Sequence, residues 1–216
     1  MKVIHIIASP RGKDSNTLKI TQEFLNSLIA SQDDLTVETV DLYREDLPAV
    51  AGSNIESRYQ LIVGQPIDPE HEESWKNIEA LIDHFLQADV VLISTPMWNF
   101  SIPYALKYYI DCLVQPGYTF GFNSEGAYGM IKDTQMVVIT SRGNNYSSNS
   151  PMRPYDHQEP YLRTVFEFIG FRDIEFINAE PMDIAPHLRD VSLEKAKKKA
   201  REVASKITVT STTAIV

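Results

Sequence analysis

The chain has 216 residues, 43% of them hydrophobic, and a formal net charge of −9. The hydrophobic fraction, and the 23% of residues that are charged, are ordinary for a globular protein, and we predict a single domain over residues 1–216. The charge argues against a nucleic-acid partner, because such domains concentrate Lys and Arg. No apolar run reaches the roughly 18 residues of a membrane span, so no membrane partner is expected. The single cysteine, Cys112, favours the cytoplasm.

Apolar runs alternate with amphipathic stretches along the chain, which predicts alternating strands and helices. The segment 43–70, which is rich in Pro and Gly, is expected to be a long connection. A β-hairpin is expected over 118–131, where aromatic residues alternate on either side of a turn at 123–126. In chain order, the remaining predicted elements are a strand at 3–8, a helix at 18–29, a strand at 35–42, a helix at 75–86, a strand at 90–94, a helix at 103–113, a strand at 135–140, a helix at 156–169, a strand at 173–179 and a helix at 192–207.

Five such alternations predict an α/β fold, with an open parallel sheet covered by helices on both faces. Ligands of such sheets bind beyond the carboxyl ends of the strands, near the point where the strand order reverses. The loops of interest are therefore 9–17, 95–101 and 141–149, which follow the first, third and fourth predicted strands.

The first loop, SPRGKDSNT, combines hydroxyl side chains with a glycine and leads into a helix. Free N–H groups and the positive end of a helix dipole make such a loop a phosphate site. It lacks both G-x-x-x-x-G-K-[ST] and G-x-G-x-x-G, so neither a nucleoside-triphosphate loop nor a nicotinamide Rossmann site is indicated. The alternative is that Ser15 only caps the helix and the remainder is a surface turn.

The second loop is bulky and mostly apolar. Trp98 and Phe100 offer flat surfaces, Asn99 offers an amide, and Pro96 and Pro103 stiffen the flanks. A planar heterocycle with a polar edge would suit it, although aromatic residues tucked under a neighbouring element are the commoner outcome. The third loop, SRGNNYSSNSP, is polar and is by itself either the other edge of such a site or a solvated loop.

Together the three loops indicate a mononucleotide site of the flavodoxin kind, with predicted strand order 2-1-3-4-5. The sequence also resembles the FMN-dependent NADH-azoreductases, which are flavodoxin-like NAD(P)H:quinone oxidoreductases. The motifs that carry the resemblance are SPRGKDSNT, PMWNFSIPYALKYYID, GYTFGFNSEGAYGMIKD, TSRG and PYLRTVFEFIGFRDIEFINAE.

The resemblance implies roles for residues in all three loops. The first would hold the FMN phosphate, the second would line the isoalloxazine with N–H groups toward N5 and O4, and the third would approach N1 and O2. It further implies a substrate pocket and no metal. The cofactor residues implied are Ser9, Arg11, Ser15, Asn16, Thr17, Pro96, Met97, Trp98, Asn99, Phe100, Ser141, Arg142, Gly143 and Asn144, and those of the substrate pocket are Tyr118, Phe120 and Tyr146.

The family also implies a homodimer whose flavin sites are completed by the second subunit, with the hairpin and the 43–70 connection as candidates for that wall. NADH or NADPH would give a hydride to flavin N5 and leave, and a quinone or aromatic azo compound would then take it, in a ping-pong scheme. Three departures stand out: Trp98 replaces a common Tyr, Asn144 replaces a common Gly, and Tyr146 lies near a His of some members.

Two alternatives stay open at this stage. The first is an electron carrier of the flavodoxin type, which binds FMN without using pyridine nucleotide. The extra hairpin and the long connection argue against it, because a carrier needs an exposed flavin edge. The second is a flavin or metal-chelate reductase on the same scaffold.

Overall fold

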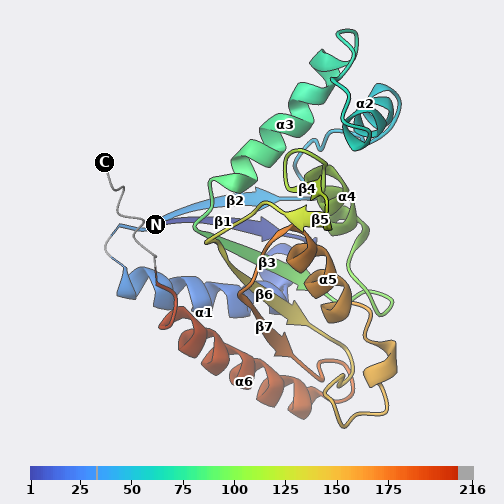
Figure 1. Cartoon of the computed structure of the whole chain (residues 1–216). Helices are drawn as coiled ribbons and strands as arrows, with labels where there is room; N and C mark the ends of the chain where they lie inside the picture. The colour runs from blue at the N-terminus through green and yellow to red at the C-terminus, as the bar shows by residue number, and fades with distance from the viewer. Residues whose placement is uncertain (33, 209–216) are drawn as a thin grey trace.

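The computed structural model describes residues 1–32 and 34–208. Its centre is a five-stranded parallel sheet in the order β2-β1-β3-β6-β7 (Figure 1). The hairpin strands take the labels β4 and β5, so this is the predicted order 2-1-3-4-5. The strands are β1 (Lys2–Ile7), β2 (Thr36–Asp41), β3 (Val90–Pro96), β4 (Phe120–Asn123), β5 (Gly126–Gly129), β6 (Gln135–Ser141) and β7 (Ile174–Ala179).

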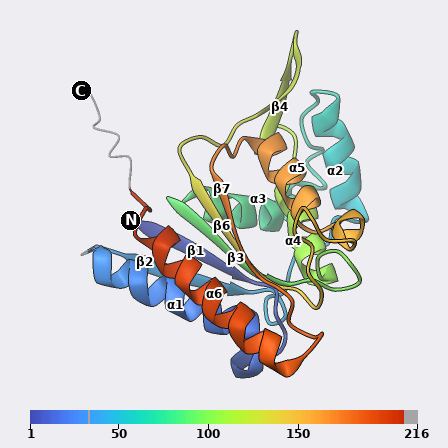
Figure 2. The same ribbon diagram turned by 90° about the horizontal axis from the view of Figure 1, so that it is seen from below.

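Helices cover both faces of the sheet, as expected (Figure 2). Residues of α1 and α6 pack on one face, and residues of α3, α4 and α5 pack on the other. The three inner strands carry nearly continuous apolar runs, which suits strands buried on both faces. The helices are α1 (Asn16–Ser31), α2 (Ser53–Ile62), α3 (Glu72–Leu86), α4 (Tyr104–Leu113), α5 (Glu159–Ile169) and α6 (Pro186–Ala204), with short 3-10 turns η1 (Gly12–Asp14) and η2 (Arg153–Tyr155).

Two expectations about local structure were wrong. The 43–70 segment is more than a connection, because it contains α2; its breakers Gly52 and Gly64 have positive φ and lie just outside that helix. The last helix begins at Pro186, six residues before the predicted start at 192. Its first turns are polar, so hydrophobic periodicity does not reveal them, whereas proline at the first helical position is a favourable start.

The hairpin β4–β5 is present as predicted and extends away from the main sheet (Figure 2). Its base packs against the end of α5, where the Phe120 and Phe168 rings lie 4.9 Å apart and the Ile131 N–H donates to Ile169 O at 3.0 Å. None of the helices in residues 1–32 and 34–208 has the length and apolarity needed to cross a membrane.

A series of buried hydrogen bonds between side chains connects β1, through Ser94 of β3, to α1. His5 Nε2 lies 2.8 Å from Ser94 Oγ, which lies 2.6 Å from Thr21 Oγ1, and that hydroxyl donates to Thr17 O at 3.0 Å. Because the Thr21 proton is used, Ser94 donates to Thr21 and accepts from His5, so the histidine is the neutral Nε2–H tautomer.

Burial lowers the pKa of His5 to about 4 from its ordinary value of 6.5. The unfolded chain therefore binds the proton more tightly, and the stabilisation is complete above about pH 6.5 and is lost as the pH falls toward 4. Relative to His5→Phe, the native protein should lose about 3 kcal/mol of unfolding free energy between pH 7 and pH 4. Urea unfolding of both proteins across that range measures it; parallel pH profiles would contradict it.

Candidate functional site

The loops after β1, β3 and β6 meet at the carboxyl edge of the sheet, around a hollow of about 160 Å³. Most of the predicted cofactor residues line it, but Asn99, Phe100 and Asn144 do not. Pro10, Met182 and Asp183 line it as well and were not predicted. The predicted residues that it brings together are Ser9, Arg11, Ser15, Asn16, Thr17, Pro96, Met97, Trp98, Ser141, Arg142 and Gly143.

The 9–17 loop presents free donors to this hollow. Ser15 caps α1, since its Oγ accepts from the Leu18 N–H at 3.2 Å, and the Ser9 hydroxyl donates to the same oxygen at 2.8 Å. The N–H groups of Asn16 and Thr17, at the start of α1, have no acceptor among the described residues. Arg11 is exposed and forms no ion pair with any residue of 1–32 or 34–208. Free N–H groups, a positive helix end and a free guanidinium are the features that suit a loop to binding an anion.

Two contacts hold the three loops together. Thr17 Oγ1 lies 2.7 Å from Ser141 Oγ, and the Met97 N–H donates to Ser141 O at 2.9 Å. The second contact continues the pairing of β3 with β6, in which Pro96 lies opposite Ser141. The relative position of the loops is thus set by the sheet and by α1.

Residues 98–101 form a β-turn at the edge of the hollow, with Asn99 and Phe100 as its two central residues. Trp98 and Ser101 exchange both backbone hydrogen bonds at 2.9 Å, and Asn99 and Phe100 between them have φ of 46° and 70°. Two positive φ values are the mark of a type I′ turn, which favours glycine at its second central position. In this protein Phe100 occupies the second central position, and the centroid of its ring lies 5.5 Å from that of Tyr155.

The geometry of this turn decides which backbone N–H groups of the second loop are available to a bound ring. The N–H groups of Met97 and Trp98 are already used, by Ser141 and Ser101. Those of Asn99 and Phe100 have no acceptor in the described part of the chain. Only the latter pair can serve a ligand without breaking a bond.

The strain at Phe100 can be measured. We expect Phe100→Gly to be more stable than Phe100→Ala by about 1 kcal/mol, because both lose the ring but only glycine tolerates the left-handed backbone. At an ordinary position alanine would be the more stable of the two. Thermal unfolding of the two variants decides it, and a more stable alanine variant would show that the turn is not strained.

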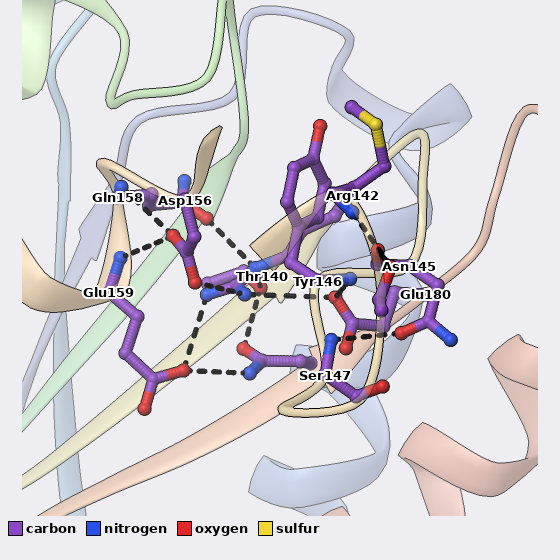
Figure 3. Close-up of polar contacts among 12 residues, drawn as sticks. Thr140, Arg142, Asn145, Tyr146, Ser147, Asp156, Gln158, Glu159 and Glu180 are labelled. Atoms are coloured by element: carbon purple, nitrogen blue, oxygen red, sulfur yellow. Dashed lines mark hydrogen bonds and ion pairs between the residues drawn. The ribbon is translucent and has the colours of Figure 1, made fainter. Parts of the chain in front are cut away.

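The third loop, after β6, offers backbone N–H groups rather than a charged side chain to the hollow. Arg142 was expected to approach the ligand, but it is only 1% exposed and its guanidinium is turned into the protein, toward Asp156 and Glu159 (Figure 3). The backbone N–H of Arg142 donates to Ala179 O at 2.9 Å. The free donors of this loop are the N–H groups of Gly143 and Asn144, which have no acceptor among the described residues.

The segment after β7 forms a fourth wall. The Met182 and Asp183 N–H groups both donate to Gly143 O, at 3.2 and 3.0 Å. A Cβ at Gly143 would lie 2.9 Å from Asp183 Oδ2, at the end of an exposed side chain that can move aside. Ligands of parallel sheets bind beyond the carboxyl ends of the strands, and β7 ends at the same edge as β1, β3 and β6, so this segment could have been predicted to border the site as well.

The three expected substrate-pocket residues do not line the hollow in this chain. Tyr118 accepts from Trp75 Nε1 at 3.1 Å and donates to Glu79, next to α3. Phe120 packs on α5, as described above. Tyr146 is buried, and burial raises the pKa of its hydroxyl. A wall built from Tyr118 and Phe120 would therefore have to come from another subunit.

A larger hollow, of about 750 Å³, lies between β2 and α3. Carboxylates of Glu38, Glu45 and Asp46 line it, which is unfavourable for an anion. Among residues 1–32 and 34–208, no three His, Cys, Asp or Glu side chains are grouped as a metal would require.

Comparison with known proteins defines the family. Residues 1–204 match a protein family described as having a flavodoxin-like fold. FMN-dependent NADH:quinone oxidoreductase 2 of Pseudomonas syringae pv. tomato is 34% identical over 207 residues, covering 96% of this chain and 99% of that protein. The FMN-dependent NADH:quinone oxidoreductase of Ruegeria pomeroyi is 36% identical over 182 residues, covering 83% and 89%. The chain belongs to the flavodoxin-like family of FMN-dependent NADH:quinone oxidoreductases.

Solved structures of this family are similar throughout the chain. An azoreductase from Bacillus anthracis superposes with a TM-score of 0.86 at 28% identity, covering 96% of this chain and all of that one. An FMN-dependent NADH-azoreductase from the same species, in complex with FMN, gives a TM-score of 0.84 at 25% identity, covering 94% and 97%. This member of the oxidoreductase family thus keeps the fold of relatives that include azoreductases.

Proposed function

We propose that the protein is an FMN-dependent oxidoreductase that passes hydride from NADH or NADPH to quinones and aromatic azo compounds. The observation that carries the proposal is the pair of free N–H groups at Asn16 and Thr17, next to the strained Trp98–Ser101 turn. The names of the relatives support the choice of FMN and NADH.

The residues present fit FMN. Its phosphate is a dianion, and the 9–17 loop offers the N–H groups of the first turn of α1 and the Arg11 guanidinium. Within residues 1–32 and 34–208, no carboxylate is bound to either. The ring carries acceptors on its polar edge, and the N–H groups of Asn99, Phe100, Gly143 and Asn144, which have no acceptor in the described part of the chain, could bind them. The donor set therefore matches both ends of the cofactor.

Bound FMN would supply the N5 position that accepts a hydride and gives it up again. The protein's part is to bind and orient. The hollow of about 160 Å³ is smaller than a typical pocket for a whole ligand. The ring would thus extend over the edge near Trp98, which is 40% exposed. A single binding place against the ring, which the reductant and the acceptor would occupy in turn, is the basis of the ping-pong scheme.

We further propose a homodimer in the cytoplasm. Trp98, Phe100 and Tyr104 are exposed beside the mouth, and a second subunit would cover them and exclude water there. The hairpin of that subunit is the proposed wall. The single cysteine, buried on α4, suits a reducing compartment.

Two-substrate kinetics test the proposed function. With FMN-loaded protein, initial rates measured over a grid of NADH and benzoquinone concentrations should give parallel double-reciprocal lines. Intersecting lines would contradict the ping-pong order. Bound FMN with no NADH oxidation would point to the electron carrier, and turnover with a ferric chelate but with neither a quinone nor an azo dye would point to a chelate reductase.

A further inference from the structure

Arg142 lies at the centre of a buried cluster of charged groups (Figure 3). Its Nη1 is 3.1 Å from Asp156 Oδ2 and 3.7 Å from Glu180 Oε2, and its Nη2 is 3.4 Å from Glu159 Oε2. Its Nε donates to Thr140 Oγ1 at 3.0 Å and to Gln158 Oε1 at 3.2 Å. Every nitrogen of the guanidinium thus has a partner inside the protein.

The partners belong to separate segments around the hollow. Glu180 follows β7, and its carboxylate accepts the Tyr146 N–H of the loop after β6 at 3.1 Å. Gln158, just before α5, donates through Nε2 to Pro96 O at 2.9 Å, at the end of β3. One side chain therefore connects the ends of three neighbouring strands.

The cluster is balanced in charge. Asp156, Glu159 and Glu180 supply three carboxylates, and Arg153 and Arg163 join Arg142 through ion pairs of 3.0 Å to Asp156 and 2.9 Å to Glu159. Buried carboxylates left without their arginine would be strongly unfavourable. Losing Arg142 should therefore reshape the loops rather than leave a small gap.

We propose that Arg142 is a positioning residue: through Glu180 and Gln158 its guanidinium holds the loop ends that receive the flavin ring, and it does not touch the flavin. This assignment rests on the proposed function. The phosphate donors on α1 lie outside the cluster, since no residue of the 9–17 loop contacts it among the described residues. Ring binding and phosphate binding should therefore respond separately.

The test compares the affinities of the apoprotein for FMN and for riboflavin, which lacks the phosphate. In Arg142→Met both affinities should fall at least tenfold and by the same factor, so that their ratio is unchanged. The control Arg201→Met removes an exposed ion pair with Glu23, between α6 and α1, and should leave both affinities within twofold of the native values. Riboflavin affinity within twofold of native in Arg142→Met, or a changed ratio, would overturn the assignment.

Glu180→Leu provides a second variant in case Arg142→Met does not fold. It removes the acceptor of the Tyr146 N–H, whereas Glu180→Gln keeps an oxygen there. In the apoprotein, the Tyr146 amide should exchange with solvent at least tenfold faster in Glu180→Leu than in Glu180→Gln, and riboflavin should bind at least tenfold more weakly. Equal exchange in the two variants would overturn the assignment.

Native apoprotein that binds neither flavin would instead contradict the proposed function. In that case the exchange experiment still decides whether Glu180 fixes the loop.

Discussion

Replacing Asn16 by proline should weaken FMN binding about 10- to 100-fold and leave riboflavin binding unchanged. The substitution removes one N–H that is free to bind the phosphate, and a hydrogen bond to a charged group contributes about 1.5–3 kcal/mol. Asn16 is the first residue of α1, where proline is well tolerated, and Ser15 has an extended backbone that suits a following proline.

The matched control is Asn16→Ala, which keeps the N–H and loses only the side-chain amide. Its FMN affinity should stay close to the native value, as measured by quenching of flavin fluorescence. Equal FMN affinity of the proline and alanine variants would show that the N–H of residue 16 does not bind the phosphate. A fall in riboflavin binding with proline would indicate damage to the loop instead.

A second large effect is expected at the base of the hairpin. In Gly129→Ala, the new Cβ would lie 2.3 Å from Gly170 N and 2.4 Å from Ile169 C. Both are backbone atoms, so the hairpin must move away from α5, and the free energy of unfolding should fall by about 3 kcal/mol. Urea unfolding measures this loss.

Gly126→Ala is the control for that variant. Gly126 has a φ of +120°, but a Cβ there would meet nothing within 4 Å. Only backbone strain applies, and the loss should be about 1 kcal/mol. If the two variants were equally stable, the tight crossing of hairpin and helix would be in doubt.

The sequence predicts the fold well because burial on both faces leaves a simple pattern. The continuous apolar runs of β1, β3 and β6 identify central strands, and the polar alternation of β2 identifies an edge strand. The helix α2 was missed because its sequence is polar and two glycines flank it, so composition alone favoured a loop.

The site was predicted less completely, for three physical reasons. A type I′ turn at Asn99 and Phe100 is hidden because phenylalanine rarely adopts positive φ. The inward direction of Arg142 depends on Asp156 and Glu180, which only the folded chain brings near it. The wall at Met182 depends on the end of β7, whose place at the sheet edge is known only once the strand order is known.

The most direct test of the account is an anaerobic visible spectrum of the protein reconstituted with FMN, before and after adding NADH and then benzoquinone. The account predicts that NADH bleaches the bound flavin and that the quinone restores its colour. This result would establish both half-reactions at one site. Failure of the protein to bind FMN would contradict the assignment of all three loops, and bound flavin that does not respond to NADH would contradict the proposed enzyme.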